Sequence, residues 1–153
     1  MCNYCGNIYI STDFGSTWTP RSILSTWINN GMSSTGQYIC ASDSGGNIYI
    51  SSDYGSSFIL SYTNKMAMGC IAVSSDGSHM VACENQNNTN YKNGIYASAD
   101  YGNTWTYNTN LSTPSQTGIS IDSTGQYIAV SIYQSKYCYI SNDSGITFTE
   151  TTI

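Results

Sequence analysis

The stretch Gly46-Asn-Ile-Tyr-Ile-Ser-Ser-Asp-Tyr-Gly-Ser-Ser-Phe58 occurs in four versions in this chain, which align without gaps. The other three span residues 6–18, 93–105 and 136–148. Their shared aspartates are Asp13, Asp53, Asp100 and Asp143, so successive copies lie 40, 47 and 43 residues apart. A period of about 40 to 50 residues is the length of one blade of a β-propeller. The spacing therefore predicts a repeat fold.

A second repeated segment precedes three of the four copies, at residues 33–41, 74–82 and 122–130. Each contains a Thr-Gly or Asp-Gly pair between apolar residues, which is a hairpin signal. Each full repeat thus predicts four short strands. The first is expected at 70–73 and 119–121, and the second at 38–41, 80–83 and 127–131. The third covers the Ile-Tyr-Ile-Ser segment, and the fourth begins at the Trp or Phe.

The first copy contains only the second half of a repeat, and the other three are full repeats. Together they give fourteen strands, or about three and a half blades. We therefore predict an all-β fold, a β-propeller made of four-stranded antiparallel meanders. At 153 residues the chain has the length of one domain, so a single propeller domain should span 1–153. Its expected parts are a half-blade at 1–22 and blades at about 23–64, 65–110 and 111–153.

Three and a half blades cannot close a ring, and an open stack would expose two long sheet edges, which natural β proteins avoid. We expect a second copy of the chain to complete the ring, most simply as a two-fold homodimer in which the hairpin 6–20 pairs with the partner. The rival hypothesis is that the chain is a fragment of a longer gene that begins in mid-blade.

Each residue type of the repeated motif has an expected structural role. The aspartate can accept hydrogen bonds from backbone N–H groups of its own turn, and the glycine tolerates a positive φ. The aromatic residue would fill the gap between neighbouring sheets. The residues concerned are Asp13, Gly15 and Trp18; Asp53, Gly55 and Phe58; Asp100, Gly102 and Trp105; and Asp143, Gly145 and Phe148.

The composition excludes several classes of partner. The formal net charge is −5 and only four residues are Lys or Arg, too few to bind a phosphate backbone, so no nucleic-acid partner is expected. No apolar run approaches the roughly 18 residues of a membrane span, and the first residues do not form an export signal. We expect a soluble chain with no membrane partner, and the sequence leaves its compartment open.

The Ser-x-Asp-x-Gly-x-Thr-Trp pattern resembles the Asp-box, or BNR repeat, of sialidases and of many non-enzymatic β-propellers. The match is strongest at Ser11-Thr-Asp-Phe-Gly-Ser-Thr-Trp18 and Ser98-Ala-Asp-Tyr-Gly-Asn-Thr-Trp105. Sialidases use three arginines, a tyrosine paired with a glutamate, and an aspartate. This chain has one arginine, Arg21, so the resemblance implies the fold and not the activity. We expect that the chain is not an enzyme. The alternative is a sialidase-like glycoside hydrolase, for which Glu84 and Glu150 could form a carboxylate pair.

Other chemistry-bearing residues favour structural roles. Cys2 and Cys5 form one CxxC, and the remaining cysteines, Cys40, Cys70, Cys83 and Cys138, occupy strand positions that suit small core residues. His79 is the only histidine and lies beside a turn. The motif aspartates are too widely spaced to share a calcium ion. No cofactor and no metal site is therefore expected.

The connections between the second and third strands, and between blades, are variable in sequence and should share one face. We expect them at 20–26, 43–45, 62–69, 84–93, 107–117 and 132–135. Binding residues often lie on such loops. All four basic residues fall in or beside these connections, so this face could bind an anionic or polar ligand such as a glycan, or a protein partner. The candidate ligand residues are Arg21, Lys65, Tyr91, Lys92, Tyr133 and Lys136. The predicted function is a non-catalytic binding or structural module.

Overall fold

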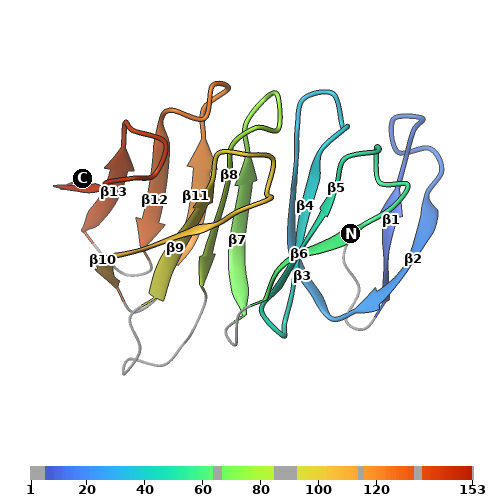
Figure 1. Ribbon diagram of the computed structural model, residues 1–153, viewed down its shortest axis with the longest axis horizontal. Helices are drawn as coiled ribbons and strands as arrows, with labels where there is room; N and C mark the ends of the chain where they lie inside the picture. The colour runs from blue at the N-terminus through green and yellow to red at the C-terminus, as the bar shows by residue number, and fades with distance from the viewer. Residues whose placement is uncertain (1–5, 64–66, 85–92, 114–115, 133–135, 153) are drawn as a thin grey trace.

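The computed structural model describes residues 6–63, 67–84, 93–113, 116–132 and 136–152. Within these ranges every regular element is a β-strand, and the fourteen strands form one two-stranded and three four-stranded antiparallel sheets. The sheets stand side by side in chain order, from blue to red in Figure 1. This arrangement confirms the all-β fold of four-stranded blades.

The first sheet is a hairpin of β1 (Gly6–Ile10) and β2 (Thr19–Ser25), here called the N-terminal hairpin. Blade 2 contains β3 (Trp27–Met32), β4 (Ile39–Asp43), β5 (Asn47–Ser51) and β6 (Ile59–Thr63). Blade 3 contains β7 (Met68–Val73), β8 (Met80–Glu84), β9 (Asn93–Ser98) and β10 (Thr106–Thr113). Blade 4 contains β11 (Gln116–Ile121), β12 (Ile128–Ile132), β13 (Tyr137–Ser141) and β14 (Thr149–Thr152).

Two segments that were expected to be connecting loops are largely strand. Residues 20–25 belong to β2, and most of the stretch 107–117 belongs to β10 and β11. Backbone pairing with a neighbouring strand, β1 for β2, β9 for β10 and β12 for β11, outweighs their polar, weakly alternating sequences. Pro20 is tolerated because β2 has a partner on one side only. The N-terminal hairpin thus extends to Ser25, beyond the expected boundary at 22.

The core lies between the sheets. Ile8 of the hairpin packs with Trp27 and Ala41 of blade 2. A larger cluster joins Ile48 and Ile50 of blade 2 to blade 3, and a third joins blade 3 to blade 4. Cys40, Cys70 and Cys83 are buried members of these clusters, and Cys138 is partly exposed. Each blade is therefore stabilised by its neighbours in the row.

Backbone hydrogen bonds join the short turns at one face, at the top of Figure 1. In each full blade the residue after the motif aspartate donates its N–H to the turn that joins the first two strands; for Tyr54 the acceptor is the Gln37 carbonyl, 3.1 Å away. Neighbouring blades are also linked there, because Ser34 donates to the Ser75 carbonyl and Ser75 to the Ser123 carbonyl. The short turns form one rigid face.

Candidate functional site

The four motif turns, here called the Asp turns, have the same hydrogen-bond network. At Asp53, Oδ1 accepts from the Ser51 hydroxyl at 2.8 Å and from the Ser57 N–H at 2.9 Å. Oδ2 accepts from the Ser57 hydroxyl at 2.6 Å, and the Ser51 hydroxyl accepts from the Gly55 N–H at 2.8 Å. Both carboxylate oxygens are thus engaged inside their own turn.

The same bonds recur around Asp13, Asp100 and Asp143, with Thr in place of Ser57. The bonds from Thr17 lower the pKa of Asp13 to about 2, and those from Ser57 lower the pKa of Asp53 to about 2. Corresponding bonds also lower the pKa values of Asp100 and Asp143. Hydrogen bonds to a carboxylate favour its charged form, so the Asp turns hold ionised, structural carboxylates.

Each Asp turn places one non-glycine residue and one glycine at positive φ; the non-glycine residue is aromatic in three turns and is Ser144 in the fourth. In blade 2 these are Tyr54 at 60° and Gly55 at 76°, the pattern of a tight hairpin turn with both central residues left-handed. A Cβ atom at Gly55 would lie 2.7 Å from the Ile10 side chain of the N-terminal hairpin. Glycine is required here both by the backbone and by the close approach of the neighbouring sheet.

In blades 2 to 4 the aromatic residue of the Asp turn faces the preceding sheet. Phe58, Trp105 and Phe148 are partly buried against the core clusters of their junctions. Trp18 has no preceding sheet to contact and is 55% exposed; its indole N–H donates to the Gly15 carbonyl of its own turn. The N-terminal hairpin therefore presents an uncovered aromatic side chain.

A groove of about 480 Å³ runs along β1, where a full blade would have its two inner strands. Tyr9 and Ile10 line it from β1, and Asn30, Met32 and Tyr54 line it from blade 2. In blades 2 to 4 the strand equivalent to β1 pairs on both sides, whereas β2 is the one described strand that pairs with β1. The groove is thus bordered by an unpaired strand edge.

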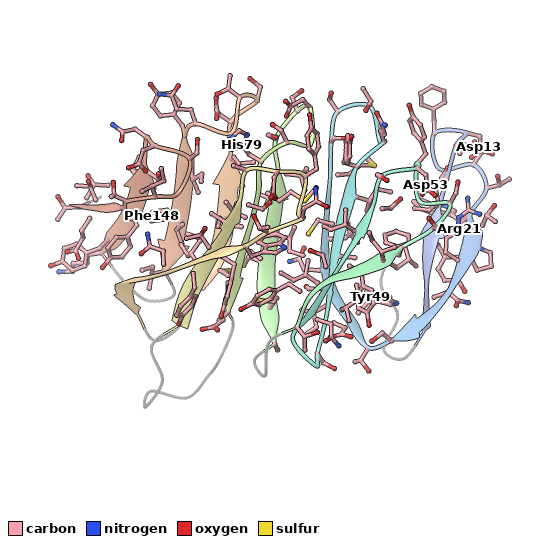
Figure 2. All side chains as sticks on the ribbon, viewed as in Figure 1. Asp13, Arg21, Tyr49, Asp53, His79 and Phe148 are labelled. Carbon is pink, nitrogen blue, oxygen red and sulfur yellow. The ribbon has the colours of Figure 1, made fainter. Side chains whose placement is uncertain are left out.

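The structure describes two of the six candidate ligand residues, Arg21 and Lys136. Lys65, Tyr91, Lys92 and Tyr133 lie outside the described residues, and Lys136 is exposed beside β13. Arg21 was expected in a variable loop, but it lies within β2, opposite Ile8, and Figure 2 shows it below the turn of Asp53. Its Nε is buried and has no hydrogen-bond partner among the described residues. Arg21 therefore belongs to the junction with blade 2 and not to the variable-loop face.

Glu84 is buried at the end of β8, with 2% of its surface exposed. Its carboxylate accepts from the Tyr96 hydroxyl at 2.8 Å and from the Gly94 N–H at 2.9 Å. Tyr96 stacks between Tyr62 and Tyr107, with ring centroids 5.1 and 4.7 Å away. Burial raises the pKa of Tyr96, and the bond to Glu84 raises it further. A raised pKa disfavours the phenolate that a nucleophile would need.

A second carboxylate that sequence analysis considered for chemistry lies elsewhere. Glu150 is exposed on β14 and accepts a hydrogen bond from Tyr139 at 2.8 Å. It belongs to blade 4, whereas Glu84 belongs to blade 3. His79 contacts the Ser78 hydroxyl at 2.9 Å and packs against the turn at Gly125, near the position labelled in Figure 2. Each of these groups is engaged locally.

The part of the chain that the structure describes contains no group of three or more His, Cys, Asp or Glu side chains placed to hold a metal ion. It also contains no helix that could span a membrane. The groove along β1 was not predicted from the sequence. Its only sequence signal was the missing upstream half of the first repeat.

No family model and no curated protein matches the chain. Solved β-propeller structures do match, over nearly its whole length. The structure of YCF48 bound to D1 peptide has a TM-score of 0.64 at 10% identity and covers 97% of this chain and 43% of that chain. The nidogen/laminin complex has a TM-score of 0.73 at 13% identity and covers 96% of this chain and 57% of that chain. The GH74 xyloglucanase from Xanthomonas campestris has a TM-score of 0.68 at 14% identity and covers 97% of this chain and 27% of that chain.

The chain spans less than two thirds of each of these structures. At such low identities the likeness shows the fold alone, and that fold is built from β-propeller blades.

Proposed function

We propose that this chain is a non-catalytic binding module of the Asp-box propeller type. In this proposal the groove along β1 binds an extended segment of a partner protein. A second copy of the chain completes the ring. The observation that carries the proposal is the unpaired edge of β1 beside a groove of about 480 Å³. A free strand edge binds an extended peptide through main-chain hydrogen bonds, while side-chain pockets provide specificity.

The other blades indicate how a strand would pair with β1. In blade 2, β5 pairs with β4, and Tyr49 lies opposite Ala41. In blade 3, Tyr96 of β9 lies opposite Ala82. Tyr9 is the equivalent residue of β1, so the incoming strand should place a small residue opposite Tyr9. The preferred ligand is therefore an extended segment with small apolar residues near its centre.

The lack of catalysis is supported by the groups that a glycosidase would use. The chain has one arginine, and Arg21 is held in a sheet junction. The Glu84 carboxylate is buried and accepts two hydrogen bonds, and the exposed Glu150 lies in a different blade. A fluorogenic sialoside should remain unhydrolysed. Among the similar structures, those titled as YCF48 with D1 peptide and as a nidogen/laminin complex have protein ligands, which supports a protein partner.

The chain's own sequence supplies a direct probe of the groove. A labelled peptide of residues 67–84, with both cysteines changed to serine, reproduces the first two strands of blade 3. Fluorescence anisotropy should show saturable binding, and a scrambled peptide should not bind. Met32→Arg should weaken binding because Met32 is 60% exposed and lines the groove. Leu60→Arg is the matched control, because Leu60 is 55% exposed and does not line the groove.

Two outcomes would overturn the peptide-binding proposal. One is that neither this peptide nor a library of extended peptides binds. The other is that binding occurs but is equally insensitive to Met32→Arg and Leu60→Arg. Binding of a glycan on an array, with no peptide binding, would favour the glycan-recognition alternative.

A further inference from the structure

The junctions between blades repeat one arrangement. At the junction of blades 2 and 3, Ser61 of β6 donates to the Gly102 carbonyl and accepts from the Trp105 indole N–H at 2.8 Å. At the junction of blades 3 and 4, Asn108 of β10 occupies the position of Ser61, and its amide donates to the Ile146 carbonyl at 2.8 Å. The fourth strand of one blade thus binds the Asp turn of the next.

The third strand of each blade completes the junction. A Cβ atom at the Asp-turn glycine would lie 2.8 Å from Ile50 for Gly102, and 3.1 Å from Ala97 for Gly145. The glycine therefore packs directly against the third strand of the preceding blade. Each junction needs two surfaces, an Asp turn on one blade and the third and fourth strands on the other.

Among the described residues, one such surface is uncovered at each end of the row. The head surface consists of Tyr9, Gly15 and Trp18 on the N-terminal hairpin. Trp18 is 55% exposed, and within 4 Å the only atom facing the Gly15 position belongs to Trp18 itself. Tyr9 is 36% exposed, whereas its equivalent Tyr96 is 4% exposed. The head surface is an Asp turn without a preceding blade.

The tail surface consists of Cys138, Ile140 and Thr151 on blade 4. By sequence alignment Ile140 occupies the position of Ile50, and Thr151 occupies that of Ser61. Register pairing places Cys138 opposite Thr151 on one face of the sheet. Ile140 is 38% exposed, although its equivalent Ile50 is 5% exposed. The tail surface carries the groups that receive an Asp turn in the other junctions.

The inner strands beside the head and tail surfaces have exposed polar side chains. Asn30 of β3 is exposed, and its equivalents in blades 3 and 4 are Ile71 and Ile119. At the other end of the row, Ser120 and Ser131 of blade 4 are exposed. In the part of the chain that the structure describes, no strand pairs with the other edge of β1, so none covers these positions. Polar residues there fit a ring in which the hairpin stands between blade 2 of its own chain and blade 4 of another.

We infer that two copies associate head to tail, with the tail surface of each copy packed against the head surface of the other, closing a ring of six blades and two hairpins. This inference rests on the proposed completion of the ring by a second copy. The Thr151 hydroxyl of one copy accepts from the Trp18 indole N–H of the other, and Ile140 packs on Gly15. The groove along β1 borders this junction, because Tyr9 and Trp18 line the groove and also belong to the head surface.

Light scattering after size exclusion tests the assignment. The native chain should have a mass near twice 16.6 kDa. Ile140→Arg on the tail and Trp18→Ser on the head should each raise the dissociation constant of the dimer by about tenfold or more, because both side chains are central to the junction. Both residues are already exposed in the single chain, so circular dichroism should show unchanged folding. Leu60→Arg, an exposed outer-strand control, should leave the dimer intact.

A mixing experiment gives the sharper readout. The Trp18→Ser copy keeps an intact tail surface, and the Ile140→Arg copy keeps an intact head surface. A mixture of the two should therefore form dimers at concentrations where each variant by itself is monomeric. A dimer insensitive to Ile140→Arg would overturn the head-to-tail assignment while leaving association of two copies in place. A native chain that stays monomeric would overturn the proposed assembly and this inference together, without affecting peptide binding in the groove. Long concentration-dependent oligomers would overturn closure by two copies.

Discussion

The indole N–H of Trp105 donates a hydrogen bond to the Ser61 hydroxyl, 2.8 Å away, across the junction between blades 2 and 3. The two residues are 44 positions apart in the chain and belong to successive repeats. This bond shows that the Asp turn has an external role besides its internal network. It fixes the tryptophan on the outer strand of the preceding blade.

Trp105→Phe should destabilise the fold by about 0.5 to 1.5 kcal/mol, because it removes this bond while keeping an aromatic ring that Phe58 and Phe148 show to be compatible with the position. Urea unfolding monitored by circular dichroism measures the change. Trp18→Phe is the matched control. The Trp18 indole bonds only within its own turn and the ring is largely exposed, so its loss should be smaller in the dissociated chain. Equal losses would contradict the role assigned to Ser61.

Gly55→Ala should be more destabilising than Gly15→Ala. Both glycines have positive φ, at 76° and 85°, so both substitutions carry a backbone cost of about 1 kcal/mol. Only at Gly55 would the added methyl group also meet the Ile10 side chain, at 2.7 Å, which adds about 1 to 3 kcal/mol of overpacking. Thermal unfolding of both variants in the dissociated Ile140→Arg background measures the difference. A larger loss at Gly15 would contradict the packing described for the junction.

The Asp turns predict a specific loss of stability in acid. The pKa values of Asp13 and Asp53 are lowered to about 2 in the folded chain, below the ordinary value of 3.8. A lowered folded-state pKa contributes stability above the unfolded-state value, and that contribution is lost as the pH falls from about 4 through 2. The melting temperature should therefore fall over this range. In Asp53→Asn the fall should be shallower, since one of these groups no longer titrates; an unchanged profile would assign the acid sensitivity to other groups.

The described cysteines should differ in reactivity. Burial raises the pKa of the Cys40 thiol, and Cys83 is buried opposite Cys70 on the neighbouring strand. Cys138 is partly exposed and should be alkylated first among these four, as peptide mapping by mass spectrometry would show. Because Cys138 belongs to the tail surface, its alkylation should be slower in the native dimer than in the Ile140→Arg variant. Equal rates at a concentration where the native chain is dimeric would contradict that placement.

The blades could be predicted from the sequence because their determinants are local. Asp53 binds groups that lie within four residues of it, so the motif itself specifies the turn. Strand pairing in the variable regions was less predictable. Thr19-Pro20-Arg21 has no apolar alternation, and it forms a strand because β1 lies beside it. That pairing is why Arg21 was placed wrongly.

The candidate site was less accessible to sequence analysis than the fold. The groove along β1 lies between blade 2 and an edge of β1 with which no described strand pairs. The buried pair of Glu84 and Tyr96 arises from the end of β8 and the register of β9, across residues that vary in sequence. Such features depend on how distant segments meet, and no single motif contains them.

The self-contained Asp turns have a consequence for how such a chain can change over evolutionary time. The internal polar contacts of each turn come from one run of seven residues, from the serine before the aspartate to the Thr or Ser after it. Duplication or deletion of a repeat would add or remove the whole turn, and every remaining aspartate would keep its hydrogen-bond partners. The motif therefore specifies how a blade is built but not how many blades there are. Blade number therefore depends on contacts outside the turns.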